Sequence, residues 1–188
     1  MVFPIRRRTV FGATASALVG SGLTYWWLER SPDDLPEPPF SLPFDPSQAG
    51  AKVSVKFRVR EYLGLTIGLS FRHLSGAPKT PRERLLVAGV PMRDATGRES
   101  DRDVAAAIQM RLFPLQPGTL ESERRMVYTR VSLAGYMGEM SRFTLEVVRL
   151  RPGSYQLEVE ATGPSRAEAP AEARLWVTPP PKMGPIPD

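Results

Sequence analysis

The sequence contains no cysteine at any of its 188 positions. A chain without cysteine has no disulfide, no thiolate metal site, no thiol nucleophile and no N-terminal cysteine that could carry a lipid. It also holds a single histidine, His73. One histidine does not make a multi-histidine zinc site, and no serine stands in the strained turn that marks a triad nucleophile. We therefore expect a structural or surface role for His73, no catalytic residue, no metal and no cofactor, so that the protein is not an enzyme.

Acidic residues are fewer than basic residues. The 20 acidic residues face 25 lysines and arginines, which gives a formal net charge of +5. A basic chain can favour nucleic acid, anionic lipid or an acidic protein, but no aromatic residues alternate with the cations as they do in nucleic-acid grooves. We expect no nucleic-acid partner. Hydrophobic residues make up 41% of the chain, which is enough for the core of one domain.

The N-terminus carries an export or membrane signal. Three arginines, residues 6–8, precede an uncharged run from Thr9 to Leu28. At ~1.5 Å per residue this run is about as long as the ~30 Å core of a bilayer. The arginines predict a cytoplasmic N-terminus, and Tyr25, Trp26 and Trp27 suit a membrane interface. We expect residues 1–28 to anchor the chain in a bacterial inner membrane, with the rest in the periplasm.

Cleavage of that segment is the alternative. Small residues such as Gly20 and Gly22 are typical of a signal-peptide cleavage site, and cleavage would release a soluble periplasmic protein. A twin-arginine signal is disfavoured because the usual polar residue before the arginine pair is missing.

Proline divides the remainder of the chain. Residues 29–44 are rich in proline and acidic residues, which is typical of an extended linker. Residues 179–188 repeat that composition as a tail. The folded domain is expected between them, over residues 45–178.

Within this domain the apolar residues recur with a period of two, which predicts half-buried strands. In the first segment Val53, Val55, Phe57 and Val59 share one face. The segment from Arg142 is expected to bury Phe143, Leu145 and Val147 in the same way. Seven segments are expected to be strands: Lys52–Arg60, Leu63–Phe71, Val104–Phe113, Met126–Leu133, Arg142–Leu150, Ser154–Ala161 and Glu172–Thr178.

One connection between strands is predicted to be helical. Thr80 suits the N-cap, Pro81 the first helical position, Glu83 the capping box and Gly89 the end of the helix. About seven short strands with one short helix favour an immunoglobulin-like antiparallel β-sandwich.

A family resemblance accompanies this layout. The segment PFDPSQAG leads into VKFRVREYLGLTIGLSFRH, a short Arg/Glu helix ending in glycine follows, and LRPGSYQLEVEA comes later. This order resembles a family of bacterial envelope proteins known only as a domain of unknown function, over about Phe40 to Thr178. The resemblance implies an exported β-sandwich and no particular activity. The lack of cysteine separates this chain from the lipoprotein members.

The densest group of charges lies between two of the expected strands. It consists of Arg93, Asp94, Arg98, Glu99, Asp101 and Arg102. Its spacing does not match a calcium loop, because Ala95, Thr96 and Arg98 occupy positions where acceptors are required. Asp101 and Asp103 are close in sequence, but neighbouring arginines would keep them ionised. We expect a solvent-exposed loop, with partner binding as the alternative.

A basic face is the other candidate. Lys56, Arg58 and Arg60 share the polar side of the first strand, where they could meet anionic lipid or an acidic protein. The simpler interpretation is the solvent side of an outer strand, where cations discourage pairing with other chains.

The function expected from these features is protein binding at the cell envelope. One version is an immunity protein that neutralises an antibacterial effector; the alternative is a structural subunit of a secretion or transport assembly. An enzyme would require carboxylates far apart in the sequence to converge. The candidates for such convergence are Asp45, Glu61, Asp94 and Asp101. Partner identity, oligomeric state and strand order stay open.

Overall fold

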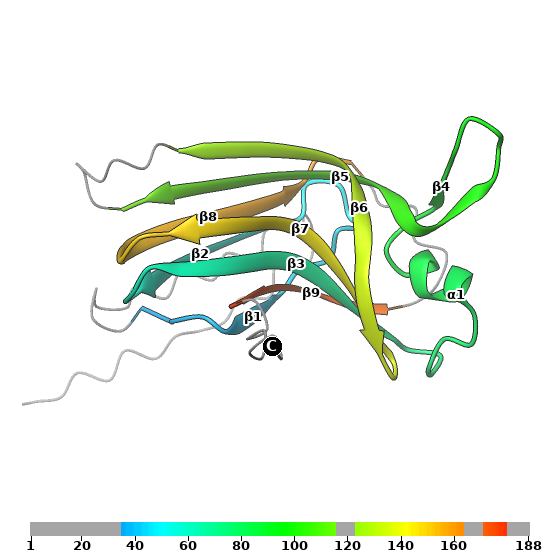
Figure 1. The fold of residues 1–188 in the computed structure, drawn as a ribbon, viewed down its shortest axis with the longest axis horizontal. Coiled ribbons are helices and arrows are strands. Elements are labelled where there is room, and N and C mark those ends of the chain that lie inside the picture. Colours follow the sequence, from blue (N-terminus) through cyan, green and yellow to red (C-terminus); the bar gives the residue numbers. More distant parts are fainter. Residues whose placement is uncertain (1–34, 116–122, 164–170, 180–188) are drawn as a thin grey trace, which may run out of the picture.

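The computed structural model describes residues 35–115, 123–163 and 171–179. These residues form nine strands and one helix (Figure 1). The elements are β1 (Phe40–Pro43), β2 (Lys52–Val59), β3 (Leu63–His73), α1 (Pro81–Leu86), β4 (Pro91–Arg93), β5 (Glu99–Pro114), β6 (Arg124–Met137), β7 (Met140–Leu150), β8 (Gly153–Ala161) and β9 (Ala171–Thr178).

All strands belong to one antiparallel sheet of order β1-β9-β3-β7-β6-β5-β8-β2, with β4 paired to β5. The sheet curls until its two end strands approach each other. The backbone N–H of Arg58 donates to the carbonyl of Pro36 at 3.0 Å, and the rings of Phe40 and Phe57 lie 5.7 Å apart. The ion pair between Arg60 and Glu37, at 2.6 Å, lies at the same junction. The result is a nearly closed, barrel-like sheet.

The predicted seven-strand immunoglobulin-like sandwich is therefore wrong, although all seven predicted strand segments are strands. Sequence shows where strands lie but not which of them pair. The short β2–β3 and β7–β8 connections look like hairpins, yet β2 pairs with β8 and β3 pairs with β7. Both connections join strands in different parts of the curled sheet, and both run through exposed residues such as Glu61 and Pro152.

Two strands escaped the sequence prediction. β1 pairs with β9 and lies in the stretch predicted to be a proline-rich linker. Its four residues are too few to show alternation. β4 is shorter still and pairs with β5 through Pro91 and Arg93.

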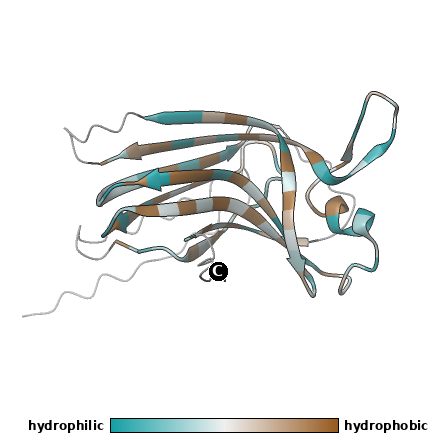
Figure 2. Cartoon of the chain, viewed as in Figure 1, coloured by the Kyte–Doolittle hydropathy of each residue, from teal (hydrophilic) through white to brown (hydrophobic). Residues whose placement is uncertain are grey.

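The core fills the interior of the curled sheet with apolar side chains from every long strand. The predicted alternation is confirmed in β8 and in the Ile108–Leu112 part of β5, where every second side chain is buried, and Figure 2 shows these strands banded by hydropathy. In β7 the prediction fails at Val147, whose side chain is 58% exposed, while Val148 is buried. The register between β3 and β7 shifts opposite Ile67 and Gly68, so the inward phase of β7 moves by one residue.

The predicted helix is confirmed, including its cap. The Thr80 hydroxyl accepts from the backbone N–H of Glu83, and the Glu83 carboxylate accepts from the N–H of Thr80. The N–H of Gly89 donates to the carbonyl of Leu85 at 3.2 Å just after the helix ends. Leu85 is buried in the core, so α1 packs at one end of the sheet (Figure 1).

Residues 1–28, the predicted anchor, lie outside the described part of the chain, as do residues 180–188 of the predicted tail. Across the described ranges, no helix combines the length and the apolar character needed to cross a bilayer.

Candidate functional site

The sheet is split between β6 and β7. The two strands pair only from Ser132 to Met137 of β6, opposite Thr144 to Met140 of β7. Before Ser132, β6 pairs with β5 alone, and after Thr144, β7 pairs with β3 alone among the described residues. In Figure 1, β6 bends away from β5 and crosses β7 only near its end. We call the split between residues 124–131 of β6 and 145–150 of β7 the seam.

One side-chain hydrogen bond bridges the seam. The Tyr128 hydroxyl donates to Oε2 of Glu146 at 3.1 Å, and the backbone N–H of Val147 donates to the other carboxylate oxygen at 3.2 Å. Tyr128 and Glu146 pair with the buried residues Ile108 and Ile67, so both face inward. Burial, and then the Glu146 carboxylate, raise the pKa of Tyr128. The pair therefore holds a neutral tyrosine as a donor beneath the seam.

Exposed apolar side chains flank the seam and the end of β6. Val127 is 64% exposed on β6 and Val147 is 58% exposed on β7. Tyr136 and Met137, at the tip of the β6–β7 hairpin, are 52% and 69% exposed. We call these four residues the β6–β7 apolar positions. Sequence reasoning missed them, because Val127 and Val147 looked like ordinary members of half-buried strands.

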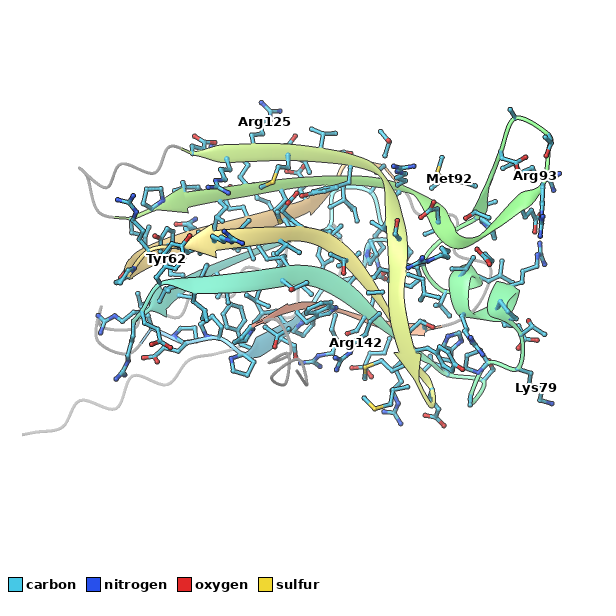
Figure 3. The ribbon with its side chains drawn as sticks, viewed as in Figure 1. Tyr62, Lys79, Met92, Arg93, Arg125 and Arg142 are labelled. Atoms are coloured by element: carbon cyan, nitrogen blue, oxygen red, sulfur yellow. The ribbon has the colours of Figure 1, made fainter. Side chains whose placement is uncertain are left out.

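Positive charge surrounds the seam. Arg125 and Arg130 are exposed on β6, and Arg149 is exposed on β7. Arg125 donates to the amide oxygen of Gln109 at 3.0 Å and projects from the outer edge of the sheet in Figure 3. Among the described residues, no carboxylate pairs with Arg130 or Arg149. The outer rim of the seam is thus apolar and cationic.

The charged cluster of residues 93–102 forms the exposed β4–β5 hairpin, which lies beside α1 (Figure 3). One carboxylate oxygen of Asp94 accepts from the backbone N–H groups of Thr96 and Arg98, at 2.8 and 3.1 Å. The hydrogen bond from the Thr96 hydroxyl is the main cause that lowers the pKa of Asp94, and these backbone hydrogen bonds lower it further. Glu99 joins Arg82 and Arg93 at 3.0 and 2.9 Å.

These contacts give part of the cluster a role in shaping its own hairpin. Asp94 closes the turn that Gly97 makes with a φ of 82°. Glu99 ties the hairpin to α1 through Arg82, and this contact is the main cause that lowers the pKa of Glu99. Arg98, Asp101 and Arg102 stay exposed on the surface. Their role in binding a partner remains a prediction.

The predicted basic face lies on β2, at one end of the sheet. Phe57 and Val59 point into the core, so Lys56, Arg58 and Arg60 line the polar side as expected. Arg60 is engaged with Glu37 at the junction with the segment before β1. Lys52 pairs with Glu160 of β8 at 3.8 Å. Part of this face therefore stabilises the closure of the sheet.

His73 lies inside the protein against a serine. Its Nε2 and the hydroxyl of Ser141 share a hydrogen bond of 3.0 Å, and the two residues are 4% and 0% exposed. Burial lowers the pKa of His73, and the nearby Glu83 carboxylate partly opposes this effect. Ser141 is sealed from solvent in this arrangement, so the pair cross-links β3 and β7 in the core.

Of the four carboxylates considered for convergence, Asp94 and Asp101 share the β4–β5 hairpin, and the other two lie in separate connections. Asp45 caps the β1–β2 loop by accepting from Ser47 and Gln48, Glu61 lies in the β2–β3 connection, and Asp94 lies in the β4–β5 hairpin. Within the described ranges, no three histidine, aspartate or glutamate side chains form a group that could hold a metal ion.

Comparison with known proteins identifies the family. A crystal structure of a protein from Sulfurospirillum deleyianum is similar in fold, with a TM-score of 0.55 and 14% sequence identity. The match covers 77% of this chain and 98% of that protein. Among curated proteins no match is found. The family profile of a domain of unknown function, DUF5625, matches residues 41–178, close to the range expected from the resemblance. Because this match covers most of the 188 residues, the chain belongs to the DUF5625 family.

Proposed function

We propose that this protein is a non-catalytic, protein-binding domain of the bacterial cell envelope. The observation that carries the proposal is the distribution of exposed apolar side chains. Of the seven large hydrophobic residues exposed among the described ranges, four are the β6–β7 apolar positions. Val127 and Val147 flank the seam, and Tyr136 and Met137 are adjacent at the hairpin tip. Exposed apolar residues grouped in this way, rather than standing singly, are typical of surfaces that meet another protein.

The envelope location is supported by the N-terminal sequence. An arginine triplet followed by the uncharged run Thr9–Leu28 is typical of a signal anchor, which would hold the domain in the periplasm. Fractionation of cells that express the full-length chain tests this. Recovery from the membrane fraction at full mass supports the anchor, recovery from the periplasm at reduced mass supports cleavage, and recovery from the cytoplasm contradicts export.

One concrete form of the proposal is an immunity protein that neutralises an effector delivered by neighbouring bacteria. A small envelope domain that acts only by binding suits that role. A structural subunit of a secretion or transport assembly is the competing form. The activity of the captured partner separates the two, because a toxic partner supports immunity and a secretion or transport component supports assembly.

The test is affinity capture from detergent-solubilised membranes with the full-length chain and two variants. The first variant replaces Val127 and Val147 by Thr and Met137 by Gln. Threonine keeps the shape and strand preference of valine, so this variant removes apolar surface at little cost in stability. The second variant replaces Arg98, Asp101 and Arg102 of the 93–102 cluster by Ala and keeps Asp94 and Glu99, which shape the hairpin. Val90→Thr, at an exposed apolar residue away from β6 and β7, is the matched control.

Each outcome has a distinct meaning. Loss of one specific partner with the first variant alone supports binding through the β6–β7 apolar positions. Loss with the cluster variant alone places recognition on the β4–β5 hairpin and contradicts the proposed surface. Failure of the full-length chain to retain any specific protein contradicts the protein-binding function itself.

A further inference from the structure

We propose that the seam binds an extended, acidic segment of the partner protein, which adds as a strand to the free edge of β6. This inference rests on the proposed function and specifies how the partner binds and what its binding segment contains. Three features of the seam carry it: unpaired backbone, an edge as long as a typical strand, and the charge of its rim.

The sheet leaves part of the backbone along the seam without a hydrogen-bonded neighbouring strand. A strand inside a sheet alternates its N–H and C=O groups between two neighbours. From Arg124 to Val131, β6 has a neighbour on the β5 side only among the described residues. Half of its backbone groups therefore point into the seam, where an added strand would pair with them.

Each of the two edges that face the seam has one register shift. β6 pairs regularly with β5 over Arg124–Tyr128, the length of a typical strand of ~5–6 residues, and its register shifts between Tyr128 and Arg130. The register of β7 against β3 shifts beside Glu146. β6 carries two of the exposed rim arginines, Arg125 and Arg130, whereas β7 carries Arg149. We therefore place an acidic added strand on β6.

The side chains of the edge define the added segment. Arg125, Val127 and Arg130 are exposed on β6, and Val147 with Arg149 lies across the seam. An added strand with apolar residues would pack on Val127 and Val147, and its acidic residues would meet the arginines. The Tyr128–Glu146 pair lies on the inner side, beneath the added strand.

The same charges argue against a second copy of this chain. Two β6 edges that pair antiparallel with Val127 opposite itself would place Arg124 opposite Arg130, twice by symmetry. Like charges directly opposite each other on paired strands are destabilising. The seam is therefore unsuited to pairing with itself and suited to an acidic strand.

The test uses a displayed library of random ten-residue peptides and the purified full-length chain. We expect the selected peptides to alternate apolar residues with Asp or Glu. Bound peptide should slow hydrogen exchange at the backbone amides of residues 124–131 and leave the β4–β5 hairpin unchanged. Selected peptides that lack acidic residues, that protect another region, or that never emerge would each overturn the proposal.

A charge-reversal variant sharpens the result. Arg125→Glu with Arg130→Glu should weaken the selected acidic peptides by about tenfold or more and should favour basic peptides in a new selection. Arg98→Glu with Arg102→Glu changes the net charge equally on the exposed β4–β5 hairpin and should leave binding within about twofold. Equal weakening by both pairs would mean that only overall charge matters, which contradicts strand addition.

This experiment separates the two proposals. If the captured partner binds the charge-reversed seam variant as well as it binds the original chain, strand addition is contradicted and the protein-binding function stands. Protein binding then uses another surface. The proposed function fails alone if acidic peptides bind the seam but no cellular protein is ever captured.

Discussion

At the scale of single residues, Gly68 is the position where the fold leaves least room. A Cβ added there would lie 2.2 Å from the carbonyl oxygen of Phe143 and 2.6 Å from the ring of Trp176. We expect Gly68→Ala to lower the free energy of unfolding by about 3 kcal/mol, because backbone and a packed indole must both shift. Gly135→Ala, at a strand glycine with nothing within 4 Å, should stay within about 0.5 kcal/mol in the same denaturant titration. Similar losses for both would contradict this account.

His73 makes stability depend on pH. Burial lowers its pKa below the ordinary value of 6.5, so the unfolded chain binds the proton more readily than the folded protein does. This contribution to stability is present above pH 6.5 and is lost as the pH falls toward the folded-state pKa. Unfolding measured between about pH 5.5 and 7.5 should show the loss, and His73→Gln should flatten the curve over that range. An unchanged slope in the variant would assign the effect to other groups.

At the scale of elements, the N-terminus of α1 is where sequence and structure agree most closely. Thr80→Ala removes the hydroxyl that accepts from Glu83 and should cost about 1 kcal/mol in unfolding free energy. Thr80→Ser keeps the hydroxyl and should recover most of the loss. A serine variant as unstable as the alanine variant would show that the methyl group of Thr80, rather than its cap, is what matters.

The bridge across the seam is a second element-scale feature. Tyr128→Phe removes the hydroxyl that donates to Glu146 and should cost about 1 kcal/mol, because the half-buried carboxylate loses one of its two donors. In a double-mutant cycle with Glu146→Gln, the two changes should be non-additive. Strict additivity would mean that the hydrogen bond contributes nothing to stability.

The sequence predicts most of the strands and the helix well, because each is marked by residues close together in the chain. The capping box of α1 needs only the residues from Thr80 to Glu83, and the alternation in β8 needs only every second residue. β1 has four residues, too few for a period to show, and lies among prolines. Val147 was assigned to the buried face because the shift of register that exposes it depends on β3, a strand far away in the sequence.

At the scale of the whole molecule, the order in which the strands pair could not be predicted from the spacing of apolar residues. β2 and β3 follow each other closely but lie in distant parts of the sheet, because β2 pairs with β8 and β3 with β7 and β9. These pairings depend on long-range packing. The candidate site shares this dependence, since the seam exists only because β6 pairs with β7 from Ser132 onward and not before it. The charged cluster, in contrast, was visible in the sequence, and its hairpin lies where a solvent-exposed loop was expected.

The central claim is that β6 and β7 leave an open edge between them, and hydrogen exchange of the full-length chain tests it most directly. We predict an alternating pattern over residues 124–131, in which amides that face β5 are protected and amides that face the seam exchange rapidly. The amides of β5 from Ile108 to Leu112, which has neighbours on both sides, should all be protected. Uniform protection of residues 124–131 at the level of β5 would mean that the sheet is closed there, and it would contradict the account.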